Sequence, residues 1–293
     1  KIIVWLAVMM YTLSGYAQNA PWNFQSKVVT DTLFSKVLNS KRAYTVFLPK
    51  SFEQNKEKKY PVLYLLHGMW ETNPVWAERG HVKDVMDRLV ASGEACEMII
   101  VTPNAGGNIH LEWNGYFDMP GWKYETFFYT EFLPYIEKKY RVIGDRQHRA
   151  IAGLSMGGYG SFLYSLHHPD MFCACAPLSA AVFDDTVMEA RKARSHKDLF
   201  NRLFGPGDEH WKQNNVLKIL SDWDQNDLPK IRYYIDCGDD DGLLDGNMQV
   251  HQIMRQKGIR HEFRVRDGGH SWTYWRTALP EVLKFVSQTF CRS

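Results

Sequence analysis

Arg149-Ala-Ile-Ala-Gly-Leu-Ser-Met-Gly-Gly158 runs from a short apolar stretch into a serine with glycines on either side. Residues 149–152 are expected to form a buried strand, and a helical pattern begins near Gly158. A serine on a sharp turn between a strand and a helix exposes its hydroxyl, and the glycines allow the two backbones to lie close together. The pattern therefore predicts that Ser155 is a nucleophile.

Similar apolar runs recur along the chain and alternate with stretches of helical periodicity. Residues 28–49 are expected to form two antiparallel strands with a turn near Ser40. Further strands are predicted at residues 60–66, 98–102, 149–152, 231–237 and 261–265. Helices are predicted at residues 82–91, 127–140, 158–167 and 248–257. Continuous apolar strands that alternate with helices are typical of a mostly parallel sheet covered on both faces, so the sequence predicts one α/β domain.

A nucleophilic serine needs a histidine as its base and a carboxylate that orients the histidine. The chain order expected here is serine, acid, histidine. His270, the last histidine, directly follows the last predicted strand and is the expected base. The acid is expected in the loop after residues 231–237, because α/β sheets place their sites at the carboxyl ends of the strands. Spacing alone does not choose among the four acids of that loop, which are Asp239, Asp240, Asp241 and Asp245.

Acyl transfer also requires hydrogen-bond donors for the negatively charged oxygen of the tetrahedral intermediate. One expected donor is the backbone N–H of Met156, which follows the nucleophile, and the other is that of Met69, in the loop after residues 60–66. His67 precedes Ser155 in the chain, so we expect it to support this oxyanion loop and not to act as the base.

Composition excludes several other classes of protein. The 293 residues include 35 basic and 33 acidic residues, a net charge of +2, which is too balanced for binding nucleic acid by phosphate neutralisation. Five cysteines without a CxxC pair predict neither a zinc site nor a disulfide scaffold. The acidic run after residue 237 does not fit a calcium loop, because Met248 stands where the closing glutamate would be. We expect neither a metal nor an organic cofactor.

The first residues have the pattern of a targeting segment. Lys1 is followed by a short apolar run and then by Gly15-Tyr-Ala17, with small residues at the positions that a signal peptidase reads. This predicts a secretory signal over residues 1–17, a mature esterase domain over residues 18–293, and a periplasmic or extracellular location. No later stretch approaches 18 apolar residues, so no membrane attachment is expected after cleavage.

The chain resembles the esterase D and feruloyl esterase group of α/β hydrolases, which includes carbohydrate esterase family 1. The similarity extends from about Val28 to Phe290. It is carried by Tyr64-Leu-Leu-His-Gly68, Ile99-Ile-Val-Thr-Pro-Asn104, Leu133-Pro-Tyr-Ile-Glu137, the segment 149–158 and Gly268-Gly-His270. The resemblance implies an α/β-hydrolase fold, in which antiparallel N-terminal strands join a mostly parallel sheet with helices on both faces. It also implies that the acid lies three residues after the glycine that ends its strand, which is Asp241 here.

The resemblance further implies a serine carboxylesterase that acts on acylated carbohydrates or related small esters, such as feruloyl or acetyl esters. Aromatic faces suit sugar and feruloyl rings, and the tryptophans expected to bind substrate are Trp70, Trp76, Trp113 and Trp272. Residues 180–213 are long enough to form a partial cap over Ser155. The alternatives left open are an S-formylglutathione hydrolase-like thioesterase, an acyltransferase with a sugar acceptor and a carbohydrate-binding pseudoenzyme. The oligomeric state is not predicted.

Overall fold

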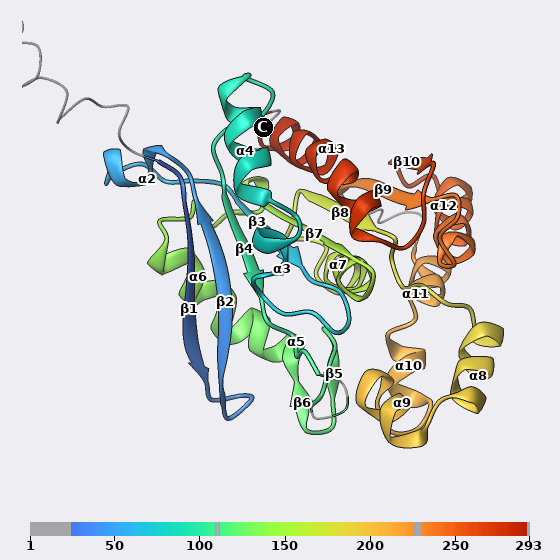
Figure 1. The fold of residues 1–293 in the computed structure, drawn as a ribbon. Helices are drawn as coiled ribbons and strands as arrows, with labels where there is room; N and C mark the ends of the chain where they lie inside the picture. Colours follow the sequence, from blue (N-terminus) through green and yellow to red (C-terminus); the bar gives the residue numbers. More distant parts are fainter. Residues whose placement is uncertain (1–24, 109, 111, 225–229, 292–293) are drawn as a thin grey trace, which may run out of the picture.

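The computed structural model describes residues 25–108, 110, 112–224 and 230–291. Within them, eight strands form one twisted sheet in the order β1-β2-β4-β3-β7-β8-β9-β10 (Figure 1). Strands β1 and β2 form an antiparallel hairpin, and β2 joins β4 in antiparallel register, while all later pairs are parallel. The strands are β1 Lys27–Ser35, β2 Ser40–Leu48, β3 Val62–Leu66, β4 Ile99–Pro103, β7 Arg149–Leu154, β8 Ala174–Leu178, β9 Arg232–Gly238 and β10 His261–Arg266.

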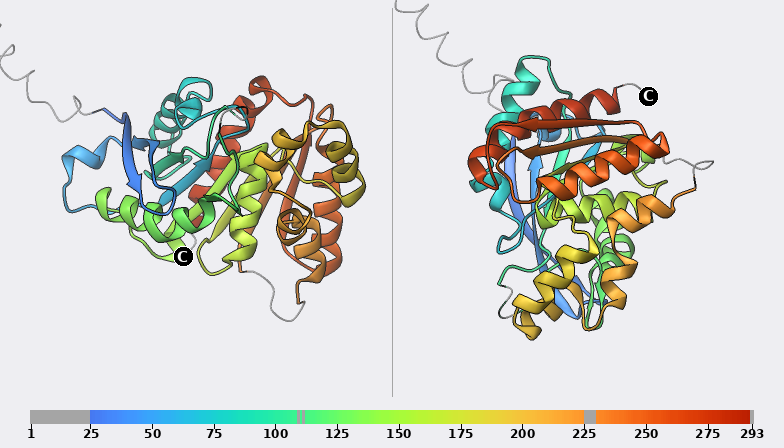
Figure 2. Two further views of the ribbon diagram at one scale, coloured as in Figure 1. Left: turned by 90° about the horizontal axis from the view of Figure 1, so that it is seen from below. Right: turned by 90° about the vertical axis from the view of Figure 1, so that its right-hand side faces the viewer.

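Both faces of the central strands are buried, which explains their continuous apolar sequences. In β3, Val62, Tyr64 and Leu66 point to one face, and Leu63 and Leu65 point to the other. The first face is covered by α5 Tyr124–Phe127, the π-helical turn η3 Phe128–Phe132, α6 Leu133–Lys139, α7 Met156–His167, α11 Val216–Asp222 and α12 Leu244–Lys257. The second face is covered by α3 Val75–Glu78, α4 Val82–Ala91 and α13 Trp272–Phe290, as Figure 2 shows from two sides. Two short helical elements complete this description: α2 Ser51–Gln54 follows β2, and the 3₁₀ turn η4 Arg146–His148 directly precedes β7.

This architecture confirms the predicted α/β-hydrolase fold, with differences at individual elements. The helix predicted at residues 127–140 begins earlier, at Tyr124, and passes through a π-helical turn. Helix α13 was not among the predicted helices, although it is the longest helix in the part of the chain that the structure describes. The turn of the first hairpin comes before Ser40, at residues 36–39.

Three helices between β8 and β9 stand apart from the sheet. They are α8 Asp185–Arg194, α9 Lys197–Phe204 and α10 Glu209–Gln213. These helices lie at the same end of the molecule as the small hairpin of β5 Asp118–Met119 and β6 Trp122–Lys123 (Figures 1 and 2). A backbone hydrogen bond from Asn114 N–H to the Arg202 carbonyl, 3.4 Å long, joins the two regions. The segment therefore forms a cap, as its length suggested.

The predicted secretory signal, residues 1–17, lies outside the described residues. None of the helices in the part of the chain that the structure describes has the length and apolar character needed to cross a lipid bilayer.

Candidate active site

Ser155 occupies the junction between β7 and α7 in a strained backbone conformation. Its φ and ψ are 54° and −116°, and residues other than glycine rarely adopt a positive φ. The Ser155 N–H donates to the Leu178 carbonyl at 2.9 Å, which ties the turn to β8. A Cβ at position 157 would lie 2.6 Å from the Leu66 carbonyl oxygen, so only glycine allows α7 to start this close to β3. The serine is therefore held at the carboxyl edge of the sheet, as its motif predicted.

His270 lies within hydrogen-bond distance of the serine. Its Nε2 is 3.0 Å from Ser155 Oγ, and its Nδ1 is 2.9 Å from Asp241 Oδ2. With the carboxylate accepting the Nδ1 proton, Nε2 is left with a lone pair that faces the serine hydroxyl. The loops that carry these residues come close together at Gly238, where a Cβ would lie 1.9 Å from the Gly268 carbonyl oxygen.

Asp241 is buried and fully hydrogen-bonded. Its side chain has no exposed surface, whereas 36% of the His270 side chain is exposed. Burial by itself would raise the pKa of Asp241, but hydrogen bonds from His270, from the Ser179 hydroxyl and from the Leu243 N–H outweigh it and hold the pKa below its ordinary value. The carboxylate is therefore ionised at neutral pH and stabilises the proton on His270 Nδ1.

Ser179 and Trp275 form a second set of contacts around the Asp241 carboxylate and His270. The Trp275 indole N–H donates to Ser179 Oγ at 3.1 Å, and the Ser179 hydroxyl in turn hydrogen-bonds to Asp241. Ser179 directly follows β8, is completely buried and has a φ of 43°. The Trp275 ring also lies edge-on against His270, with centroids 4.8 Å apart. Sequence reasoning missed Ser179, whose positive φ has no signal in its residue type.

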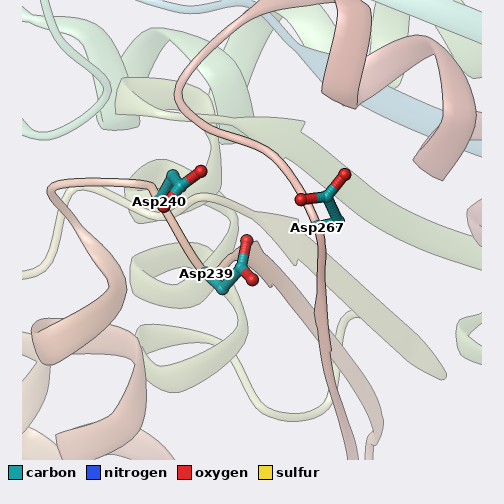
Figure 3. Close-up of side chains that lie close together, drawn as sticks. All are labelled: Asp239, Asp240 and Asp267. Carbon is teal, nitrogen blue, oxygen red and sulfur yellow. The ribbon is translucent and has the colours of Figure 1, made fainter.

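The remaining acids of the loop point elsewhere. Asp239 accepts a hydrogen bond from the Gly268 N–H at 2.9 Å. Asp239 and Asp240 are exposed and lie beside Asp267 (Figure 3). One carboxylate oxygen from each of the three lies within 4.8 Å of the other two. Asp245 is exposed in the first turn of α12 and does not cap that helix. Among the four acids that the spacing left open, the structure brings Asp241 alone to His270.

The loop after β3 is rigidly held around His67. Its Nε2 accepts from the Ala105 N–H at 3.0 Å, which leaves the ring proton on Nδ1, 2.8 Å from the Gly68 carbonyl oxygen. Burial lowers the pKa of His67 to about 4, so the ring is neutral. As a trans peptide points its N–H away from its carbonyl oxygen, this bond also orients the Met69 N–H. Within the described residues, no protein group accepts from the Met69 N–H.

Met69 and Met156 both border the same cavity as Ser155. The Met156 N–H belongs to the first turn of α7, where backbone N–H groups have no partner inside the helix and favour negative charge. Glu71 fixes the Met69 loop further, because its carboxylate accepts from the Gly68 N–H at 3.1 Å and from the Trp272 indole at 2.6 Å. Two backbone donors that border one cavity with a serine hydroxyl can together bind an oxyanion.

The four tryptophans expected to bind substrate do not share one environment. Trp76 is completely buried, with its indole N–H bonded to the Leu66 carbonyl, and Trp272 is 5% exposed and bonded to Glu71. The expectation of a binding role fails for these two, because packing between α3 and α13 leaves them no free face. Trp113 is partly buried against the core. Trp70 is 50% exposed and lies against His110, with ring centroids 5.0 Å apart.

The cavity that opens onto Ser155 is largely apolar. It lies between the core and the cap, and the cap contributes Phe183, Arg191, Leu203 and Phe204. The Arg191 guanidinium sits 4.0 Å from the centroid of the Phe183 ring. Core residues complete the wall, namely Asn114, Gly115, Tyr116, Phe117 and Tyr159. The sequence predicted a cap but not these lining residues, since their proximity depends on how the cap packs.

Comparisons with known proteins identify esterases that are similar to this chain. A solved structure described as a ferulic acid esterase is 68% identical, superposes with a TM-score of 0.82, and matches 92% of this chain and 100% of its own. An endo-1,4-beta-xylanase/feruloyl esterase of Xylanibacter ruminicola is 30% identical over 86% of this chain, which spans only 30% of that longer protein. An acetyl esterase of Caldicellulosiruptor saccharolyticus is 23% identical over 87% of this chain and 96% of its own.

The family model described as "Putative esterase" matches residues 35–286, which include all three members of the Ser155–His270–Asp241 chain. Proteins similar to this chain include ones named as feruloyl, ferulic acid and acetyl esterases. The protein is a carboxylic ester hydrolase and belongs to this esterase family of α/β hydrolases.

Proposed function

We propose that the protein hydrolyses feruloyl esters of carbohydrates by a Ser-His-Asp mechanism. The observation that carries this proposal is the apolar cavity that opens directly onto Ser155, which itself lies 3.0 Å from His270 Nε2. The similarity to a ferulic acid esterase over nearly the whole chain supports the same substrate class.

In the proposed mechanism, Ser155 Oγ attacks the ester carbonyl while His270 Nε2 takes the hydroxyl proton. The N–H groups of Met69 and Met156 bind the oxyanion, and Asp241 stabilises the imidazolium that forms. His270 then gives its proton to the leaving alcohol oxygen, which leaves the acyl group on Ser155. Water, activated by the same imidazole, releases the acid and restores the serine.

The walls of the cavity suit an aromatic acyl group. Phe183, Leu203 and Phe204 of the cap provide apolar surface for a flat ring. Arg191 is the charged side chain among the lining residues and provides a donor for the phenolic and methoxy oxygens of a feruloyl group. The carbohydrate alcohol would then remain at the open side of the site, near the exposed Met69 and Trp70.

A substrate comparison tests this assignment. Burying one face of a feruloyl ring contributes about 3 kcal/mol, so we expect kcat/KM for methyl ferulate to exceed that for methyl acetate by about 100-fold. S-formylglutathione is the third substrate of this comparison. In a separate reaction with methyl ferulate and xylose, the release of free ferulate is compared with the formation of a new ester. Equal rates on all esters, preference for S-formylglutathione, or transfer to xylose in place of release would contradict the proposal.

A matched pair of variants locates the acyl site. Phe204→Ala removes one wall of the cavity and is expected to raise KM for methyl ferulate by about tenfold, because about 1.4 kcal/mol of ring burial is lost. KM for methyl acetate should stay within about twofold of the wild-type value. Phe34→Ala removes an exposed aromatic side chain on β1 and is expected to change neither. A loss that is equal for both esters in Phe204→Ala would place the feruloyl ring elsewhere.

We also propose that residues 1–17 are a secretory signal cleaved after Ala17, so that the enzyme acts outside the cytoplasm. The basic, apolar and small-residue pattern of this segment supports the proposal. N-terminal sequencing of the exported protein would test it.

A further inference from the structure

Two of the five cysteines lie outside the sheet, and folding brings them together from distant parts of the chain. Cys96 belongs to the loop between α4 and β4, and Cys291 directly follows α13. The other three, Cys173, Cys175 and Cys237, are buried in or beside the strands.

Ser287 of α13 holds the backbones of both cysteines. The Cys96 N–H donates to Ser287 Oγ at 2.7 Å, and the Cys291 N–H donates to the Ser287 carbonyl at 3.1 Å. An ion pair between Lys284 and Glu94, 3.4 Å long, ties the same two segments together. The Cys291 thiol is also a close neighbour of the Cys96 thiol and contributes to its raised pKa. A bond between the two sulfurs would therefore require little movement of the backbone.

We propose that Cys96 and Cys291 form a disulfide when the folded protein meets a disulfide oxidant, such as glutathione disulfide or a thiol–disulfide oxidoreductase. The exposed Cys291 thiolate attacks one sulfur of the oxidant and releases the first thiol. The Cys96 thiolate then attacks the Cys291 sulfur of this mixed disulfide and releases the second thiol. Two protein thiols are oxidised, the oxidant disulfide is reduced to two thiols, and the protons of the protein thiols pass to the released thiolates.

The order of attack follows from the two environments. Burial raises the pKa of the half-buried Cys96 thiol and limits the access of an external disulfide to it, whereas Cys291 is exposed. An external disulfide thus reaches Cys291 first, and Cys96 is already in place to resolve the mixed disulfide. This sequence of events needs no opening of the fold.

The bond would fasten the end of α13 to the loop before β4. Helix α13 begins at Trp272, two residues after His270, so the tether would hold the far end of the helix that follows the site. The disulfide closes a loop of roughly 200 residues in the unfolded chain, which restricts that chain and raises Tm by at least about 5 °C.

The test compares reduced and oxidised wild type with two serine variants, and none of its measurements depends on enzyme activity. After treatment with glutathione disulfide, we expect a peptide map without reductant to contain one linked pair, joining Cys96 to Cys291, and three titratable thiols to remain of the five. Tm is expected to rise and to return with dithiothreitol. Cys291→Ser should lose both the linked pair and the rise.

Cys173→Ser is the matched control. Its hydroxyl can replace the Cys173 thiol as donor to the Gln147 carbonyl, and it should retain the linked pair and the rise in Tm. Five titratable thiols in treated wild type, or glutathione on Cys291 without the linked pair, would overturn the proposal. A linked pair that leaves Tm unchanged would overturn the proposed tether.

Discussion

At the scale of single residues, burial and direction separate Asp241 from its acidic neighbours. Its carboxylate contacts His270 Nδ1 through both oxygens, at 2.9 and 3.1 Å, and is closed off from solvent. Asp239, Asp240 and Asp245 are exposed in the same loop and the following turn. A carboxylate that holds the imidazole must have the first environment, because it has to fix one tautomer and stabilise the imidazolium.

Replacing each acid by its amide tests this difference. Asp241→Asn is expected to lower kcat by about three to four orders of magnitude, because an amide favours the wrong tautomer of His270. Asp239→Asn, Asp240→Asn and Asp245→Asn should each stay within about tenfold of wild type, since side chains exposed at the surface contribute little to the site. Steady-state kinetics on methyl ferulate would decide, and a severe loss in one of these three with an active Asp241→Asn would show that the acid is misassigned.

The sequence predicts Ser155 and His270 from their motifs and chain order, but residue types alone leave the acid open. Neighbouring aspartates in a tight loop differ in where their side chains point, and that direction depends on the approach of Gly238 to the Gly268 carbonyl. Only the family spacing favoured Asp241 in advance. For Ser179, whose role comes from a positive φ and a partner on α13, the sequence offered no signal.

At the scale of elements, the loop after β3 depends on a neutral His67. The folded protein keeps this imidazole unprotonated down to a pKa of about 4, while an imidazole in the unfolded chain takes up a proton near pH 6.5. Between these values the unfolded state binds more protons, so stability falls as the pH decreases from about 6.5 to 4 and is unaffected by His67 above that window. The loss amounts to at most about 3 kcal/mol.

Urea unfolding of wild type and His67→Gln at pH 7 and pH 4.5 checks this expectation. Glutamine can replace both hydrogen bonds of the ring without titrating, so its free energy of unfolding should fall less than that of wild type over this interval. His196→Gln, which changes an exposed side chain, is expected to keep the wild-type dependence. If His67→Gln and wild type lose the same free energy, His67 is not the buried neutral group described above.

Elements differed in how well the sequence predicted them. Apolar strands such as β3 and β4 were located within two residues, because burial on both faces requires apolar residues at successive positions. Helix α13 escaped prediction because Pro280 lies in its interior, where proline removes a backbone donor and is usually unfavourable. Its apolar spacing was nonetheless present at Ala278, Leu279, Val282, Leu283 and Val286.

At the scale of the whole molecule, the parallel sheet brings the serine, the acid and the histidine together at one edge. Ser155 follows β7, Asp241 follows β9 and His270 follows β10, and these strands end at one edge of the sheet. Strand order and direction therefore made the grouping of these residues predictable. The cavity was not, because its walls come from the α8–α10 cap and the loop before β5, and their packing depends on contacts between segments far apart in the chain.

The most direct test of the proposed mechanism is to measure kcat/KM for methyl ferulate in wild type and in Ser155→Ala. The variant is expected to lose activity by on the order of 10⁴-fold or more while keeping the wild-type Tm, because the hydroxyl performs chemistry and supports no part of the core. Ser195→Ala removes another hydroxyl that lines the cavity. Its kcat/KM should remain within about twofold of wild type, because Ser195 is partly exposed and does not belong to the hydrogen-bonded set Ser155, His270 and Asp241. Hydrolysis by folded Ser155→Ala within tenfold of the wild-type value would contradict the proposed mechanism.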